Sequence, residues 1–402
     1  MDIALTPEAR QLTKELEAWL DDNLPEDFGK AWRLPRDPAE RVAWLRDWQA
    51  RLAKDHWVAI HWPSEHGGRA ASLEEQVAYH AVMARRRPPM LIGNTGLSLC
   101  GPTIITHGSD AQRQRFLPPM LTGEEIWCEG FSEPEAGSDL AGLKTRGIVE
   151  GDQLVITGQK TWTSAAMIAD WMFALVRTDP DAPKRDGISF VLIPMDAEGL
   201  DARPIKQISG DAEFCEVFLD EVRVPLDNVV GDLNQGWYVA RTTLSHERST
   251  IFVASQMRMT RQLETIAGVL AKATDPDGSP RQARHDLRQR LAQAWIDSQL
   301  SRVHGARSFA TIAAGHEPGP EAAVTKLFGQ ESEKRLHELA LDACGPAGLL
   351  DKGSNEAPDG GKWILGWLRT RASTIGGGTS EIQRNILAER VLGMPRDPWS
   401  DQ

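Results

Sequence analysis

The hydrophobic periodicity of this chain changes twice, and the resulting order of helix, strand and helix limits the folds open to it. Near the N-terminus Leu12, Leu16 and Leu20 recur at helical spacing, and helical patterns return from Gly236 onward. Between them lie short β-branched or aromatic segments separated by Gly, Asp and Pro turns, a pattern typical of an antiparallel barrel or sandwich. These segments are residues 154–156, 171–176, 188–193 and 216–219.

This order predicts an α+β protein with three domains. We expect an N-terminal helical domain over residues 1–125, a middle antiparallel β-barrel domain over 126–232, and a C-terminal four-helix-bundle domain over 233–402. No Gly-x-Gly-x-x-Gly closes a strand, so the sequence gives no support for a nicotinamide-binding Rossmann domain.

Charge and cysteine usage exclude several classes of protein. The formal net charge of −12 argues against nucleic acid as a partner, because such binding depends on basic patches. No apolar run approaches the ~20 residues that span a bilayer, and the acidic N-terminus lacks the features of a signal peptide. The four cysteines are scattered without a Cys-x-x-Cys pair, which predicts neither a zinc site nor disulfides and favours the cytoplasm.

Two polar motifs within the β-rich region carry the side chains that a planar cofactor needs. The run Phe-Ser-Glu-Pro-Glu-Ala-Gly-Ser-Asp-Leu covers residues 131–140, and Lys-Thr-Trp-Thr-Ser covers residues 160–164. Hydroxyl groups in both motifs can hydrogen-bond ring nitrogens and carbonyls, and Trp162 offers an indole to cover a flat ring. Either motif alone is also ordinary turn chemistry, but their combination favours a buried planar cofactor.

A glycine-rich motif near the C-terminus offers backbone groups to a ligand. The run Ile-Gly-Gly-Gly-Thr-Ser-Glu-Ile-Gln-Arg covers residues 375–384 and leads into a helical sequence. Its glycines allow close approach to the backbone, and a helix beginning near Thr379 would favour anionic or polar groups. By itself such a loop is often only a turn, so the motif indicates a ligand-binding site only in combination with the other two motifs.

Together these motifs resemble those of the acyl-CoA dehydrogenase family. The resemblance implies an FAD-containing subunit that oxidises an acyl-CoA thioester to the 2,3-enoyl-CoA, by abstraction of the α-proton and transfer of the β-hydride to flavin N5. Electrons then usually pass to an electron-transfer flavoprotein. The resemblance extends over nearly the whole chain, through residues 62–68, 101–103, 131–140, 162–164, 231–237 and 375–384.

The resemblance also assigns roles to individual residues. Ser132 would meet the pyrimidine edge of the flavin, whereas Trp162 and Ser164 would cover the ring and reach N5. The backbone N–H of Gly377 would polarise the thioester carbonyl. The predicted cofactor-binding residues are Phe131, Ser132, Ser138, Trp162, Thr163, Ser164, Thr379 and Glu381. The predicted substrate-binding residues are Ser138, which would contact the CoA arm, Ser245, Arg248 and Gly378.

The position of the catalytic base departs from the commonest family pattern. Many members carry a glutamate where this chain has Gly377, and glycine cannot accept a proton. A minority, including isovaleryl- and long-chain-type enzymes, carries the base at a position that Glu247 matches, and Arg248 then resembles the family's CoA-contacting arginine. Glu381 is the alternative, although in the family pattern its position faces the other end of the cofactor.

A second departure concerns the contacts that family members lend to a neighbouring subunit's FAD. Where the family has Arg-x-x-Phe-Gly, residues 275–280 read Asp-Pro-Asp-Gly-Ser-Pro, and an aspartate would repel the pyrophosphate. Residues 342–348 likewise depart from Gln-x-x-Gly-Gly-x-Gly. We therefore hypothesise a heteromer with a second dehydrogenase-like subunit, as in bacterial enzymes acting on steroid side-chain CoA esters. The alternative is a homo-oligomer that holds the FAD tail with other residues.

Other activities and the substrate are left open by the sequence. One alternative is a related oxidase or monooxygenase, in which oxygen reoxidises the flavin, and another is a non-catalytic partner subunit. The loop at residues 352–361 and the tryptophans at 363 and 367 are compatible with a bulky or steroid-like acyl group, but they are also compatible with core or interface positions.

Overall fold

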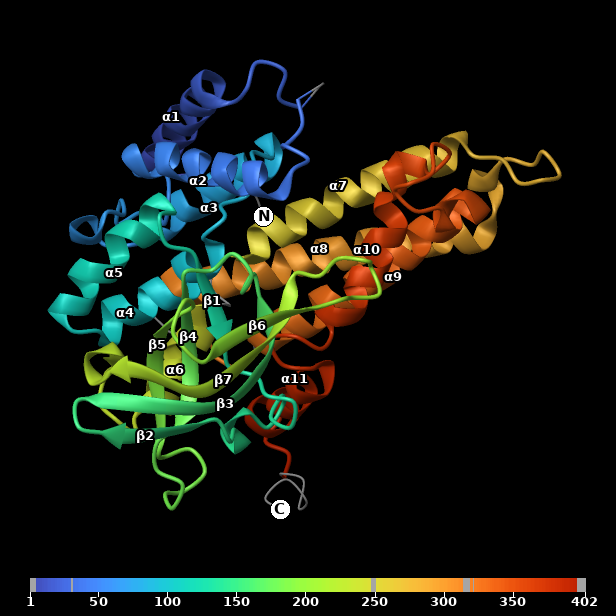
Figure 1. Ribbon diagram of the computed structural model, residues 1–402. Coiled ribbons are helices and arrows are strands. Elements are labelled where there is room, and N and C mark those ends of the chain that lie inside the picture. Colours follow the sequence, from blue (N-terminus) through green and yellow to red (C-terminus); the bar gives the residue numbers. More distant parts are fainter. Residues whose placement is uncertain (1–4, 30–31, 247–250, 314–318, 321, 396–402) are drawn as a thin grey trace. The chain divides into compact units, whose positions relative to one another are not determined.

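The computed structural model describes residues 5–29, 32–246, 251–313, 319–320 and 322–395, which form two compact units. The sheet unit comprises residues 5–79 and 87–246, and the bundle unit comprises residues 80–86 and the described residues from 251 onward. Their elements are labelled in Figure 1. The α+β class is confirmed, whereas the predicted three-domain boundaries 1–125, 126–232 and 233–402 remain predictions.

Side-chain caps define where the N-terminal helices begin. The hydroxyl of Thr6 accepts a hydrogen bond from the Ala9 N–H at 3.2 Å, and Pro7 occupies the first turn of α1. Ser109 and Gln112 form a reciprocal capping box at the start of α5. The helices are α1 (Pro7–Asn23), α2 (Pro38–Lys54), α3 (Leu73–Arg86), α4 (Gly101–His107), α5 (Asp110–Thr122) and α6 (Gly236–His246).

The strands of the sheet unit form one mixed sheet in the order β6-β7-β3-β2-β4-β5-β8, with β1 pairing β4 off this path. Most pairs are antiparallel, but β1 and β2 each pair β4 in parallel, so the predicted barrel is not purely antiparallel. The chain passes through β3 before it returns beside β2, and this crossover gives β4 the direction of β2. The strands are β1 (Trp127–Gly130), β2 (Arg146–Glu150), β3 (Gln153–Ser164), β4 (Trp171–Arg177), β5 (Ile188–Pro194), β6 (Leu200–Ile205), β7 (Phe214–Pro225) and β8 (Val229–Val230).

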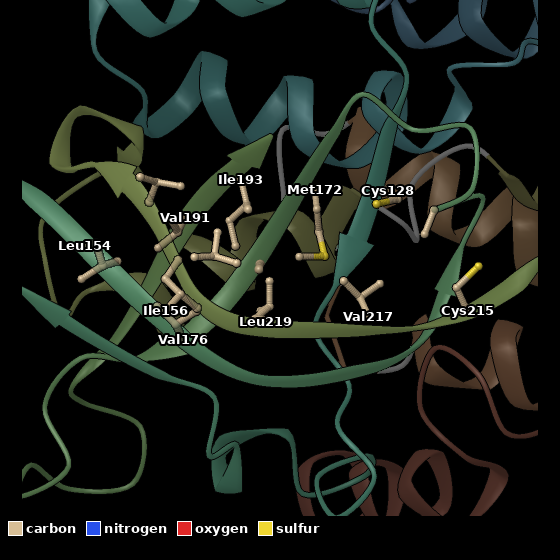
Figure 2. Close-up of a cluster of buried hydrophobic side chains, with 14 residues drawn as sticks. Cys128, Leu154, Ile156, Met172, Val176, Val191, Ile193, Cys215, Val217 and Leu219 are labelled. Carbon is tan, nitrogen blue, oxygen red and sulfur yellow. The ribbon is translucent and has the colours of Figure 1, made fainter. Parts of the chain in front are cut away.

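A continuous apolar core lies inside this sheet. Figure 2 shows side chains from β1, β3, β4, β5 and β7 directed toward a common interior. Leu154, Ile156, Val176 and Val191 are fully buried there. The alternation of inward and outward residues along each strand explains why the same strands also present a second, outward face for other contacts.

Close packing of α6 against β5 depends on the glycine at the start of α6, and this gives a test of the fold. A Cβ atom on Gly236 would lie 2.3 Å from the carbonyl carbon of Ser189 and 2.4 Å from the amide nitrogen of Phe190. We expect Gly236→Ala to destabilise the protein by about 1–3 kcal/mol, because backbone atoms of β5 must move. Thermal unfolding measures this. The matched control is Gly268→Ala, at an exposed helical position with open space around it, and this variant should have a higher melting temperature. An unchanged melting temperature in Gly236→Ala would contradict the close packing of α6 against β5.

The bundle unit consists of long helices around their own apolar core. Met259, Leu263 and Ile266 of α7 pack with Leu336 and Leu339 of α9 in that core. Within the part of the chain that the structure describes, every helix is too short or too polar to cross a bilayer. The helices are α7 (Ile251–Lys272), α8 (His285–Ala313), α9 (Ala322–Cys344), α10 (Lys362–Ser373) and α11 (Ser380–Ile386).

Candidate active site

A β-bulge in β3 presents an indole on the surface of the sheet unit. The register between β3 and β7 shifts between Lys160 and Thr163, and Trp162 has φ of +60°. A positive φ is unfavourable for a bulky residue, so the surrounding pairing must enforce it. Trp162 is 59% exposed, and its ring lies edge-on to Phe214 at a centroid distance of 6.1 Å. An exposed, strained indole is the kind of outlier that marks a binding surface.

The two polar motifs lie side by side at this bulge. The Thr161 N–H donates to the Ser132 carbonyl oxygen at 2.9 Å, which joins the 131–140 segment to β3. Ser132 and Ser164 are both half-buried. Ser164 follows Trp162 in β3, whereas Ser132 belongs to the segment that is hydrogen-bonded to β3. The sheet unit therefore gathers two short hydroxyl side chains and a flat aromatic, and this donor set fits the edge and face of a flavin ring.

The remaining predicted cofactor residues of the sheet unit occupy different environments. Phe131 is buried and packs edge-on against Phe173 and Phe190, so its ring is part of the core. Thr163 is fully buried, and its hydroxyl has no hydrogen-bond partner among the described residues. Ser138 is exposed in the loop that follows the tight Glu133–Ala136 turn. The ligand roles of these residues stay predictions.

A buried ion pair joins the two motifs, because Glu133 belongs to the first and Lys160 to the second. The Lys160 ammonium donates to Glu133 Oε1 at 2.8 Å, to the Leu175 carbonyl at 2.7 Å and to the Phe131 carbonyl at 3.3 Å. Both charged side chains are excluded from solvent. The carboxylate also accepts backbone N–H groups, from Lys144 at 2.7 Å and from the following residue at 2.9 Å. The pair is thus fully hydrogen-bonded, which is what a buried charge requires.

The two charges shift each other's pKa. Burial lowers the pKa of Lys160 to about 8, against the opposing effect of the Glu133 carboxylate. Burial by itself would raise the pKa of Glu133, but the neighbouring ammonium and the N–H donors lower it below its ordinary range. The hydrogen bonds fit a charged pair, since the ammonium has three acceptors and the carboxylate has three N–H donors.

The sequence analysis missed this pair, although a signal for it was present. Leu154 and Ile156 lie on the buried face of β3, and the period of two residues places Lys160 on that same face. A lysine on a buried face requires a carboxylate partner. The partner could not be read from the strand itself, because Glu133 lies 27 residues earlier in the chain.

In the bundle unit the glycine-rich motif forms a turn that leads into α11. Gly377 and Gly378 have φ of +62° and +89°, a backbone conformation that favours glycine. Lys326 of α9 donates to the Gly378 carbonyl, and the buried Gln383 amide lies 3.4 Å from the Gly377 carbonyl. Gly377 itself is exposed. The loop is thus held from its carbonyl side.

The predicted cofactor residues after this loop have structural partners. The Thr379 hydroxyl caps α11 by accepting from the Ile382 N–H at 3.1 Å. Glu381 is exposed and lies 3.5 Å from Arg384. Their contacts with a cofactor stay predictions. Glu247 and Arg248 lie outside the described residues, and Ser245 is described only as a backbone position in α6.

The segment at residues 275–280 is closed by an internal ion pair. Arg281 is buried and donates to Asp275 at 2.9 Å, and also to the carbonyls of Thr274 and Ala343, each at 3.0 Å. Asp342 pairs with Arg290 at 2.6 Å. The carboxylates at both departures from the family pattern therefore have cationic partners within this chain.

Trp363 was predicted either to line a site for a bulky acyl group or to be part of the core. It is buried in the core of the bundle unit, in agreement with the second alternative.

The chain matches known sequences along most of its length. Models of the N-terminal, middle and C-terminal domains of acyl-CoA dehydrogenase match residues 6–124, 128–222 and 234–392. The acyl-CoA dehydrogenase IpdE1 of Mycobacterium tuberculosis is 39% identical over 97% of this chain and 99% of that relative.

Solved structures agree with these sequence matches. The steroid acyl-CoA dehydrogenase Tcur3481-Tcur3483 has a TM-score of 0.83 at 30% identity, covering 99% of this chain and 100% of that chain. The ChsE4-ChsE5 complex from M. tuberculosis has a TM-score of 0.82 at 29% identity, with the same coverage. The predicted resemblance is confirmed: the chain belongs to the acyl-CoA dehydrogenase family and is an oxidoreductase acting on CH–CH bonds.

Proposed function

We propose that this chain dehydrogenates a bulky, steroid-like acyl-CoA thioester at its α,β-bond, with FAD as cofactor. The observation that carries the proposal is the surface around Trp162, where an exposed indole stands on a strained bulge beside Ser132 and Ser164. The substrate class is supported by relatives of similar length that are described as steroid acyl-CoA dehydrogenases.

The residues divide the chemistry between them. FAD, when bound, supplies the acceptor for the hydride of the β-carbon. The hydroxyls of Ser132 and Ser164 would bind the flavin ring, and Trp162 would cover its face. Glu247 removes the α-proton, which is weakly acidic, and the Gly377 N–H acidifies it further by polarising the thioester carbonyl. Each of these roles rests on the motif match and the chemistry of the residue.

A substrate panel tests the proposal. The protein, alone and co-expressed with a dehydrogenase-like subunit that keeps the Arg-x-x-Phe-Gly and Gln-x-x-Gly-Gly-x-Gly segments, is assayed with acyl-CoA esters from short-chain to steroidal. The assay uses an artificial electron acceptor. We expect a 2,3-enoyl-CoA product lighter by two hydrogens, formed fastest from the steroidal esters. Turnover confined to short straight chains contradicts the substrate class. Hydrogen peroxide formed in place of acceptor reduction favours the oxidase alternative.

We also propose that the chain works as part of a heteromer in the cytoplasm and passes electrons to an electron-transfer flavoprotein. Asp275 and Asp342 replace the groups that relatives lend to a neighbour's FAD, and both are paired within this chain. A partner with intact segments would supply those contacts. Relatives that are described as two-component complexes support this arrangement.

The heteromer proposal predicts a flavin deficit in the isolated chain. Purified alone, the chain should retain well below one FAD per chain, and co-expression with the partner should restore flavin. Protein-to-flavin ratio from absorbance and oligomeric state from light scattering measure this. A stable homotetramer with one FAD per chain contradicts the proposal and favours the homo-oligomer alternative.

A further inference from the structure

The buried Lys160–Glu133 pair connects the two motifs that provide Ser132 and Trp162. Its ammonium reaches the Phe131 carbonyl, one residue before Ser132. It also reaches the Leu175 carbonyl of β4. The next residue after Lys160 along β3 donates its N–H to the Ser132 carbonyl, and Trp162 follows. The pair therefore joins the two polar motifs to each other and to β4, because Glu133 belongs to the first motif and Lys160 to the second.

The valence of the ammonium makes this arrangement specific. A lysine has three N–H donors, and here each has an acceptor: Phe131 and Glu133 in the 131–133 segment, and Leu175 in β4. Glu133 in turn holds the backbone at residues 144–145 through both of its oxygens. Neither side chain of the pair is exposed to a ligand, so their influence on the surface must pass through the backbone.

We propose that Lys160 and Glu133 are positioning residues for the flavin-binding surface. They hold the 131–133 segment against β3, and this fixes where the Ser132 hydroxyl and the Trp162 indole lie. A pair of buried charges is otherwise a weak contributor to stability compared with apolar residues of the same volume. The pair links one residue of each motif, and this position accounts for it as a means of placing the two motifs. This inference rests on the proposed function.

The test uses a variant that removes both charges, because a single replacement would leave the other charge buried and unpaired. Lys160→Met with Glu133→Gln preserves side-chain volume, and the glutamine oxygen can still accept an N–H from residues 144–145. We expect this double variant to fold but to bind FAD about tenfold more weakly or worse, the scale on which lost supporting contacts act on affinity. Arg223→Met, which breaks the exposed Arg223–Glu150 pair of the same sheet, is the control and should bind FAD normally.

Hydrogen exchange of the purified protein provides a readout independent of activity. In the double variant, amides of residues 131–133 and 160–162 should exchange faster, whereas those of β5 at residues 188–193 should not change. Faster exchange throughout the sheet unit would indicate a role in stability alone and overturn the proposal. So would unchanged exchange and unchanged FAD affinity.

The outcome is separable from that of the proposed function. A wild-type complex that binds FAD but oxidises no acyl-CoA contradicts the proposed reaction and leaves the exchange and affinity measurements to decide the positioning role. A wild-type complex that binds no flavin contradicts both.

Discussion

Replacing Glu247 with glutamine should lower the rate of acyl-CoA oxidation by at least ~10²-fold, the scale of a missing general base. Glutamine keeps the volume and hydrogen-bonding capacity of the side chain but cannot accept the α-proton. Flavin content should not change, because the residue has no predicted contact with the cofactor. Steady-state turnover with an artificial acceptor, at saturating substrate and with FAD content measured on the same sample, gives the comparison.

A second glutamate in the same region of the sequence provides the control for Glu247→Gln. Glu264→Gln on α7 removes an exposed carboxylate from the same region of the sequence and should leave turnover at the wild-type level. Retained turnover in Glu247→Gln would remove this residue as the base. Attention would then move to Glu381 or to a residue of a partner subunit.

Replacing Lys160 with methionine should be the most destabilising single change in the sheet unit that we predict. The substitution leaves the Glu133 carboxylate buried without its counter-ion, a change that costs about 3–5 kcal/mol in comparable pairs. It also leaves the carbonyls of Phe131 and Leu175 without their shared donor. Urea unfolding, followed by fluorescence and by circular dichroism, measures the loss.

Two further variants separate this effect from a general effect of lost charge. The double replacement Lys160→Met with Glu133→Gln should recover most of the lost stability, since no unpaired charge remains. Arg223→Met removes one partner of an ion pair that is half exposed and should cost about 0–1 kcal/mol. A loss in Lys160→Met no larger than that of Arg223→Met would contradict the buried pair.

Much of the fold could be predicted because its signals are local. The helix caps at Thr6 and the period of Leu12, Leu16 and Leu20 act within one or two turns, and the structure has a helix there with these residues buried. Strands β4 and β5 are continuous apolar runs and were equally accessible to prediction. By contrast β2 is mostly exposed and β6 alternates between partly buried and exposed residues, so their sequences carry no clear apolar pattern. Pairing with neighbouring strands is what makes them strands.

The candidate site likewise has features that the sequence predicts and features that only the fold determines. The residue types at 131–140, 160–164 and 375–384 are legible in the sequence, since the chemistry of hydroxyls, an indole and glycines does not depend on the fold. Their orientation does. Trp162 is exposed whereas Thr161 and Thr163 are buried, and Lys160 is buried as well, so which side chains face solvent here depends on how β3 pairs with β7 in the folded sheet.

The sequence by itself determined the order of the elements, the family, and the absence of a glutamate at position 377, because all three are properties of residue type and local spacing. Only the tertiary structure decided the mixed direction of the strands, the strained bulge under Trp162 and the partnership of Lys160 with Glu133. The physical reason is that strand register and the satisfaction of a buried charge are set by segments far apart in the chain, which meet only when the sheet forms.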